Sequence, residues 1–175
     1  MPGWSTDRRR MSDTQKPPRP GEVVLDVTPG AAAAGPSLEF IGEIRTPWGP
    51  DDCPRNLIQA RETGAAARVI LRPEFRPGLL GLEPGQHVIL LYWMDRARRD
   101  LIRQNPRHGA GLRGAFALRS PIRPNPVSLA TVRITTLDAQ TGELGIDAID
   151  CFDRTPLLDI KPWKPGIDIP DGRAP

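Results

Sequence analysis

The sequence has no long apolar run and only two cysteines, and each shortage excludes a class of protein. No stretch approaches the roughly 18 consecutive apolar residues that cross a bilayer, so we expect no transmembrane segment. Basic residues near the N-terminus are not followed by an apolar segment, which argues against a secretory signal and predicts a cytoplasmic protein. Cys53 and Cys151 lie far apart in the sequence, so we expect two reduced thiols and no metal site.

The sequence also lacks the strand–helix alternation of dinucleotide-binding folds. No G-x-G-x-x-G motif follows a predicted strand, which argues against a Rossmann domain. Alternation of apolar and polar residues dominates instead, with connections rich in glycine and proline. Short strands joined in this way favour an all-β fold, a small single-sheet β-barrel. The predicted strands are Leu38–Arg45, Ala67–Leu71, His87–Met94, Gly114–Leu118, Val127–Leu137 and Leu144–Asp150.

Few other elements are expected. Apolar residues among charges predict a helix or turn over Arg96–Gln104, and a second short helix is expected within Asp51–Arg61. The valines between Val23 and Val27 predict a short edge strand. Residues 1–36 otherwise contain too few large apolar side chains to form a core, which predicts a flexible tail. The barrel domain is expected over residues 37–166, followed by a C-terminal tail over residues 167–175.

Positive charge is concentrated in one segment, although the net charge of the chain is only +3. Between Arg96 and Arg123 there are eight arginines and a single acidic residue, Asp100. Such a segment is either a solvated, arginine-rich face or a patch that follows the phosphates of RNA, for which the guanidinium group is well suited. The eight are Arg96, Arg98, Arg99, Arg103, Arg107, Arg113, Arg119 and Arg123.

The most informative run is Gly114 to Ala130, which reads GAFALRSPIRPNPVSLA. Its three prolines fix φ, and each restricts the residue before it to extended geometry. A surface loop does not need this much stiffening. We therefore expect the loop to present Arg119, Arg123 and Asn125 to a ligand in one fixed geometry.

This run resembles the GVFATRSPxRPNPIGLS signature of the TsaA/YaeB family, whose characterised members are TrmO-type tRNA methyltransferases. Three further blocks are similar to the family and follow its order. Phe40–Trp48 resembles xIGxIrSPy, Gly81–Trp93 resembles GLExFSHLW, and Asp150–Trp163 resembles DxxDGTPxxDIKPY. The resemblance implies a β-barrel that binds S-adenosylmethionine and methylates N6 of threonylcarbamoyladenosine at position 37, in the anticodon loop of tRNA. It also implies a homodimer.

The resemblance assigns candidate residues but no general base. Arg119 matches the arginine of ATRS, Leu129 the leucine of GLS, and Asp153–Pro156 the DGTP cofactor loop. Asn56 follows Pro54-Arg55 as in a PRQ motif, and Met94-Asp95 stands where bacterial relatives often carry Phe-His. The candidates for the cofactor are thus Asn56, Met94, Asp95, Arg119, Leu129, Asp153, Arg154, Thr155 and Pro156, and those for the substrate are Arg113, Arg123, Asn125 and Lys161.

Several of these residues also have a purely structural interpretation. Arg119 would then pair with Asp150 or Asp153, the loop at Asp153 would be a capped turn, and Lys161 would pair with Asp159. Arg154 replaces the glycine of DGTP, which predicts a changed or strained loop, since arginine adopts φ > 0 poorly. His87, Trp93, Phe116 and Trp163 are each interpreted as core residues more readily than as ligand contacts.

Three other functions remain open from the residues alone. The first is a methyltransferase that uses S-adenosylmethionine on another RNA or on a small molecule. The second is a non-catalytic barrel that still binds the cofactor or RNA. The third is an RNA-binding barrel without a cofactor.

Overall fold

The computed structural model describes residues 17–29, 37–106, 109 and 111–169. Contacts within the chain group it into two units, which are described separately. The barrel unit consists of Ala34–Asp95 and Val127–Pro175, and the arginine unit consists of Met1–Ala33 and Arg96–Pro126. The predicted tail at residues 1–36 lies partly outside the described residues, and so does the predicted tail at residues 167–175. The proposed domain limits stay a prediction.

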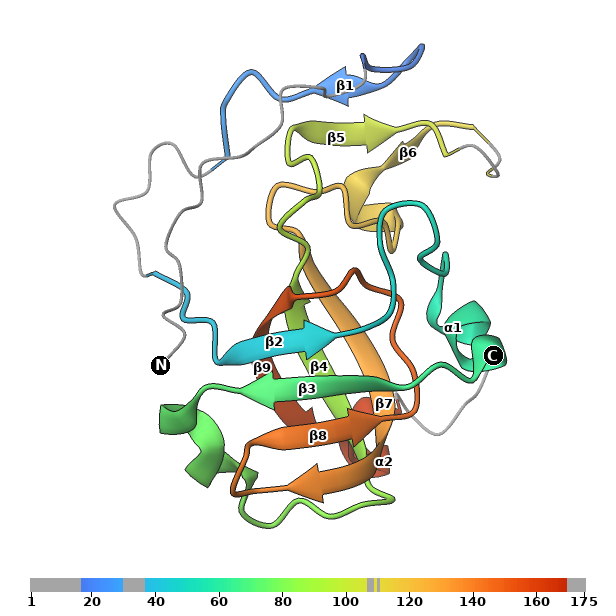
Figure 1. Ribbon diagram of the computed structural model, residues 1–175. Coiled ribbons are helices and arrows are strands. Elements are labelled where there is room, and N and C mark those ends of the chain that lie inside the picture. The colour runs from blue at the N-terminus through green and yellow to red at the C-terminus, as the bar shows by residue number, and fades with distance from the viewer. Residues whose placement is uncertain (1–16, 30–36, 107–108, 110, 170–175) are drawn as a thin grey trace. The chain divides into compact units, whose positions relative to one another are not determined.

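Six antiparallel strands close into the barrel, which confirms the predicted all-β fold (Figure 1). Their order around the barrel is β2-β3-β8-β7-β4-β9, so each strand has a partner on both edges. Closure leaves no unpaired strand edge in this sheet. The strands are β2 (Gly42–Arg45), β3 (Ala67–Leu71), β4 (His87–Trp93), β7 (Val127–Asp138), β8 (Glu143–Ile146) and β9 (Thr155–Pro162).

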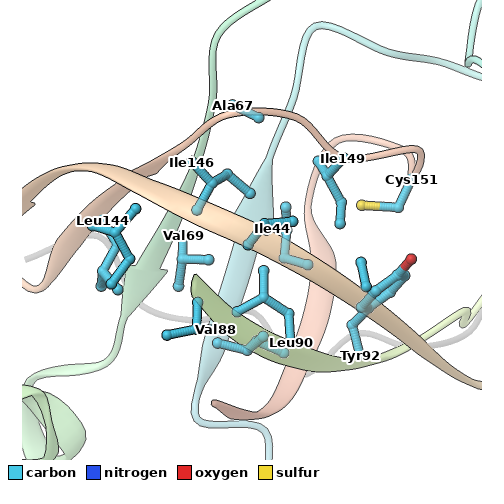
Figure 2. Close-up of a cluster of buried hydrophobic side chains, with 14 of the residues drawn as sticks. Ile44, Ala67, Val69, Val88, Leu90, Tyr92, Leu144, Ile146, Ile149 and Cys151 are labelled. Carbon is cyan, nitrogen blue, oxygen red and sulfur yellow. The ribbon is translucent and has the colours of Figure 1, made fainter. Parts of the chain in front are cut away.

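The interior of the barrel is filled by every second side chain of these strands. Ile44, Val69, Val88, Leu90 and Leu144 have no measurable exposure. Figure 2 shows them pointing together into the space that the strands enclose. Burying one such side chain contributes about 1.5–3 kcal/mol, so the core holds the barrel closed.

The described part of the barrel unit has three short helices, two of which connect strands, while the last follows β9. The helix α1 (Leu57–Thr63) joins β2 to β3, as expected within Asp51–Arg61. It begins where the Asn56 side chain accepts a hydrogen bond from the backbone of Gln59 and ends at Gly64, whose φ is 65°. These are the side-chain N-cap and the left-handed C-terminal residue that helices favour. The other two are the 3-10 helix η1 (Pro73–Leu79) and α2 (Pro165–Asp168).

The arginine unit contains a three-stranded sheet in the order β1-β5-β6. Its strands are β1 (Val23–Val24), β5 (Leu101–Gln104) and β6 (Arg113–Gly114). The predicted edge strand is confirmed as β1, although it is only two residues long. A single 3-10 turn, η2 (Ala115–Ala117), follows β6 directly.

Three sequence predictions are corrected by the structure. A helix over Arg96–Gln104 is wrong, because Leu101–Gln104 pairs with β1 and β6 as strand β5. A strand over Gly114–Leu118 is wrong as well, because η2 replaces most of it. Strand β9 was not predicted, and it lies between β2 and β4. In each case pairing with distant segments overrides the local pattern.

Candidate ligand-binding site

One end of the barrel gathers chain segments that are distant in the sequence. Trp93 at the end of β4 pairs with Val127 at the start of β7, and Ile44 near the end of β2 pairs with Thr155 at the start of β9. The start of β9 also pairs with β4, through Leu157 and Tyr92. We call this end the rim and define it as residues 45–56, 93–95, 127–129 and 149–156.

The rim contains every predicted cofactor residue of the barrel unit. Met94 and Asp95 follow β4, Leu129 lies on β7, and the Asp153–Pro156 loop leads into β9. Leu129 lies on the outward face of its strand, with an exposed fraction of 41%. The structure therefore brings together Asn56, Met94, Asp95, Leu129, Asp153, Arg154, Thr155 and Pro156. Arg119 belongs to the arginine unit.

Asp153 is the electrostatic anchor of the loop in the rim. Its Oδ1 accepts hydrogen bonds from Arg45 Nε at 2.8 Å and from the backbone N of Thr46 at 3.1 Å. Burial disfavours its ionised form, but the bonds from Arg45 and Thr46 outweigh burial and lower the pKa of Asp153. The same hydrogen bond, donated to Asp153, raises the pKa of Arg45. The pair is thus charged at neutral pH and ties the loop to the end of β2.

Arg154 keeps the backbone conformation that glycine would take at this position. Its φ of 64° makes it the one non-glycine residue with positive φ in the part of the chain that the structure describes. Its backbone N donates to the carbonyl of Ile44 at 2.9 Å, and that of Asp153 donates to Trp48 at the same distance. The sequence predicted a changed or strained loop, and the structure shows a strained one. A non-glycine residue in this region costs about 1–2 kcal/mol.

Two candidate side chains of the rim already have intramolecular partners. The hydroxyl of Thr155 is buried and donates to the carbonyl of Phe152 at 2.8 Å. The Oδ1 atom of Asn56 accepts a hydrogen bond from Gln59 N at 2.9 Å as the cap of α1. For Thr155 this bond agrees with the interpretation of the loop as a capped turn, whereas Asn56 serves as the N-cap of a helix.

A polar groove of about 460 Å³ adjoins the rim on the outer surface of the barrel. Gly145 lies within it, and a Cβ atom there would come within 2.4 Å of Thr136 Oγ1. Opposite charges line it, since Arg68 Nε lies 3.5 Å from Glu143 Oε1 and Arg45 pairs with Asp153. The lining residues are Arg45, Thr46, Pro47, Ala66, Ala67, Arg68, Thr135, Thr136, Glu143, Gly145, Ile146 and Asp153.

Lys161 does not join the other candidates. It pairs with Ile89 on β4 and lies six residues along β9 from Thr155, which places it about 20 Å from the start of the strand. Its Nζ lies 2.7 Å from Asp159 Oδ2, as the ion-pair interpretation predicts. The expectation that His87 is a core residue is wrong, because His87 is exposed and its ring lies edge-on to Trp163 at 6.0 Å.

Neither cysteine offers a reactive thiolate at neutral pH. Burial raises the pKa of Cys53 to about 11, with smaller contributions from Asp150 and Asp52. Cys151 is fully buried within the rim, and burial raises its pKa further still. We therefore assign no nucleophilic role to either side chain, since the thiolate is the nucleophile.

The signature loop of the arginine unit is stiffened by side chains as well as by prolines. Arg123 Nη2 donates to the carbonyls of Ala115 and Leu118 at 3.0 and 3.4 Å. Arg99 Nε donates to the carbonyl of Pro124 at 2.7 Å, and its Nη2 lies 3.5 Å from Asn125 Oδ1. The predicted substrate residues Arg123 and Asn125 thus hold the loop itself, while Arg113 and Arg119 have exposed side chains.

Sequence reasoning missed several residues that build these two regions. Arg45 and Thr46 anchor the loop at Asp153, and Gln104 Nε2 donates to the carbonyl of Ile122 at 2.6 Å. The resemblance of Phe40–Trp48 to a family block was the available signal for the first two. The role of Gln104 had no sequence signal, because a lone glutamine after Leu101-Ile102-Arg103 forms no distinctive pattern.

The charges of the two units are opposite. The described residues of the arginine unit include eight arginines and three acidic residues, a net charge of +5. Those of the barrel unit include ten basic and fifteen acidic residues, a net charge of −5. Among the described residues there is no helix long and apolar enough to span a membrane and no group of three metal-ligating side chains.

The chain is similar to known proteins over most of its length. Residues 43–169 match the family model described as "tRNA-methyltransferase O N-terminal domain". An S-adenosyl-L-methionine-binding protein of Archaeoglobus fulgidus is 38% identical over 132 residues, which cover 75% of this chain and 91% of that protein. A second protein of that organism, named "Probable S-adenosyl-L-methionine-binding protein", is 37% identical over 135 residues. The match covers 75% of this chain and 35% of that protein.

The fold is also similar to a solved structure. A crystal structure of TrmO from Pseudomonas aeruginosa superimposes with a TM-score of 0.63 at 31% sequence identity. The similarity covers 80% of this chain and 61% of that one. The chain therefore spans 35% of one relative and less than two thirds of the solved TrmO chain.

Proposed function

Since the chain belongs to the tRNA-methyltransferase O N-terminal domain family, we propose that it binds S-adenosylmethionine and methylates tRNA. The observation that carries this proposal is the rim, where segments from four parts of the chain place eight candidate residues at one end of a closed barrel. The relative from A. fulgidus that is covered over 91% of its length is named for binding the same cofactor.

The residues of the rim fit this cofactor by their chemistry. The exposed Leu129 offers an apolar surface for the adenine, and the Asp153–Pro156 loop offers backbone groups held in place by Arg45, Thr46 and Ile44. Asp95 offers an anion for the sulfonium of the cofactor. Outside the rim, the family resemblance assigns Arg119 of the arginine unit to the carboxylate of the cofactor. When bound, S-adenosylmethionine supplies an electrophilic methyl group, so the protein chiefly has to orient donor and acceptor.

The acceptor in this proposal is N6 of threonylcarbamoyladenosine at position 37 of tRNA. This nucleoside bears a carboxylate beside the phosphates of the anticodon loop, and the arginine unit has a net charge of +5 over its described residues. Charge-assisted hydrogen bonds from Arg113 and Arg123 suit both kinds of anion. We place the enzyme in the cytoplasm and expect it to act as a homodimer.

The first experiment is a calorimetric titration of S-adenosylmethionine into the full chain. We expect Arg119→Ala and Leu129→Asp each to weaken binding at least tenfold, because a charged hydrogen bond contributes about 1.5–3 kcal/mol and a carboxylate disrupts an apolar wall. Lys161→Ala is the matched control and is expected to bind normally, since Lys161 lies far along β9 from the rim. Absence of binding by the wild type, or equal loss in all three variants, would refute the cofactor assignment.

A second experiment tests the transfer itself. We expect radiolabelled methyl groups to be incorporated into tRNA that carries unmethylated threonylcarbamoyladenosine, and not into tRNA that carries plain adenosine at position 37. Normal cofactor binding without incorporation into either tRNA would refute the tRNA acceptor. The protein would then act on another RNA or on a small molecule, or would bind the cofactor without catalysis.

A further inference from the structure

The expectation that Phe116 is a core residue is wrong, because its side chain is 81% exposed and it is the one exposed Phe, Tyr or Trp among the described residues. It occupies the middle of η2, and the preceding Ala115 is 1% exposed, so the turn has its small residue inside and its large apolar residue outside. Single exposed apolar residues are common on protein surfaces. The exposure of Phe116 therefore indicates a binding site only together with the residues around it.

The turn that carries Phe116 is held firmly within the arginine unit. Arg123 Nη2 donates to the carbonyls of Ala115 and Leu118, the residues that begin and follow η2. Leu118 N also donates to the carbonyl of Ala115 at 3.3 Å. Gly114, which precedes the turn, is paired with Arg103 across the β5–β6 ladder. The backbone that carries the Phe116 ring is thus fixed before binding, so little conformational entropy is lost when a ligand binds.

The surroundings of the ring are cationic and open. The side chains of Arg103 and Arg113 make no hydrogen bond or ion pair with another described residue, and both residues are exposed. A Cβ atom on Gly114 would meet nothing within 4 Å, so a flat group can approach the backbone beside the ring. The hydrogen-bond partners of the Arg123 guanidinium are carbonyl groups, so no carboxylate of the described residues offsets its positive charge.

A flat group that also bears negative charge matches this surface. The bases of a double helix are stacked on each other, so a protein aromatic ring reaches the face of an unpaired base only. Acidic peptides lack a regular alternation of flat rings and charges, which single-stranded RNA has in every nucleotide. We propose that Phe116 stacks on an unpaired nucleobase of the RNA substrate, with Arg103 and Arg113 contacting the adjacent phosphates. Arg123 also holds η2 in place, through its bonds to the carbonyls of Ala115 and Leu118. This inference rests on the proposed tRNA substrate.

The test compares Phe116→Ala, Phe116→Leu and Phe116→Trp in the full chain. The probes are an RNA hairpin with an unpaired seven-nucleotide loop and an RNA duplex of equal length and charge. We expect the Ala and Leu variants to bind the hairpin about tenfold more weakly, in keeping with the loss of one stacked base, and the duplex as the wild type does. The Trp variant keeps an aromatic ring and should bind the hairpin as the wild type does. Leu80→Ala is the matched control, because Leu80 is 95% exposed in the barrel unit and is not expected to matter.

A spectroscopic signal identifies the stacking directly. With 2-aminopurine at one loop position, the wild type should quench its fluorescence on binding, and Phe116→Ala should not. Wild-type hairpin affinity in both the Ala and Leu variants would overturn the proposal. So would a loss of dimer in sedimentation without a loss of RNA affinity, since the ring would then contact a second copy of the chain.

The outcome is separable from that of the proposed function. Calorimetry with S-adenosylmethionine tests the rim, and the Phe116 variants are expected to bind this cofactor normally. If the protein does not bind the cofactor but Phe116 still stacks on the hairpin, the proposed function is refuted. The stacking role of Phe116 then stands. If the protein binds the cofactor and transfers methyl groups normally, but the Phe116 variants bind RNA as the wild type does, the proposed function stands and the role of Phe116 is refuted. Thermal denaturation of each variant checks that the exposed substitution leaves the fold intact.

Discussion

At the scale of the residue, Arg154 shows how the loop of the rim is kept in a conformation that its side chain disfavours. The bonds from Arg154 N to Ile44 and from Asp153 N to Trp48 fix the backbone, and Asp153 is held by Arg45. We predict that Arg154→Gly raises the free energy of unfolding by about 0.5–1 kcal/mol. Glycine relieves the strain of a positive φ, while its greater entropy in the unfolded chain offsets part of the gain. Urea denaturation measures the difference.

The matched control for this prediction is Arg154→Ala. Alanine keeps the strain of the left-handed backbone and removes the guanidinium group, whose side chain is 68% exposed. Its free energy of unfolding should therefore stay within about 0.5 kcal/mol of the wild type, as expected for a surface substitution. If the free energy of unfolding rises as much in the alanine variant as in the glycine variant, the stabilisation comes from removing the arginine side chain and not from relief of backbone strain.

At the scale of the element, the sequence predicted what depends on local pattern and missed what depends on distant pairing. Strand β3 was predicted to the residue, because alternation in Ala67–Leu71 is bounded by polar turns. Strand β9 was missed, since Thr155-Pro156 and Lys161-Pro162 resemble loop sequence until β2 and β4 pair with both edges. In the site, family motifs located the rim residues, whereas the bond from Arg99 to the carbonyl of Pro124 depends on folding and leaves no local signal.

Gly42 is the residue on which the β2–β3 pairing depends most directly. A Cβ atom at this position would lie 2.3 Å from the carbonyl oxygen of Ile70 and 3.0 Å from Leu71 Cα. These are backbone atoms of the neighbouring strand, so relief requires the strands to separate. We predict that Gly42→Ala lowers the free energy of unfolding by about 2–3 kcal/mol, at the upper end of overpacking costs. Gly78→Ala has nothing within 4 Å of its new atom and should be nearly neutral. Equal effects of the two variants in urea denaturation would contradict this account.

At the scale of the whole molecule, the net charge of +3 conceals two opposite charges. The described residues of the arginine unit carry +5 and those of the barrel unit carry −5. Binding of RNA releases counterions in proportion to the phosphates that the protein contacts. The salt dependence of RNA binding should therefore be set by the arginine unit and be insensitive to lysines of the barrel.

Arg103 tests this partition most directly, since it is exposed and has no ion-pair partner among the described residues. We predict that Arg103→Ala reduces the slope of log K against log salt by about one for a tRNA ligand. Binding of S-adenosylmethionine should be unchanged, because Arg103 is not among the residues proposed to bind the cofactor. Lys164→Ala, which removes an exposed charge from the barrel unit, is the control and should leave the slope as it is. An equal change of slope in both variants would mean that RNA contacts the two units alike, and the charge partition would then have no part in recognition.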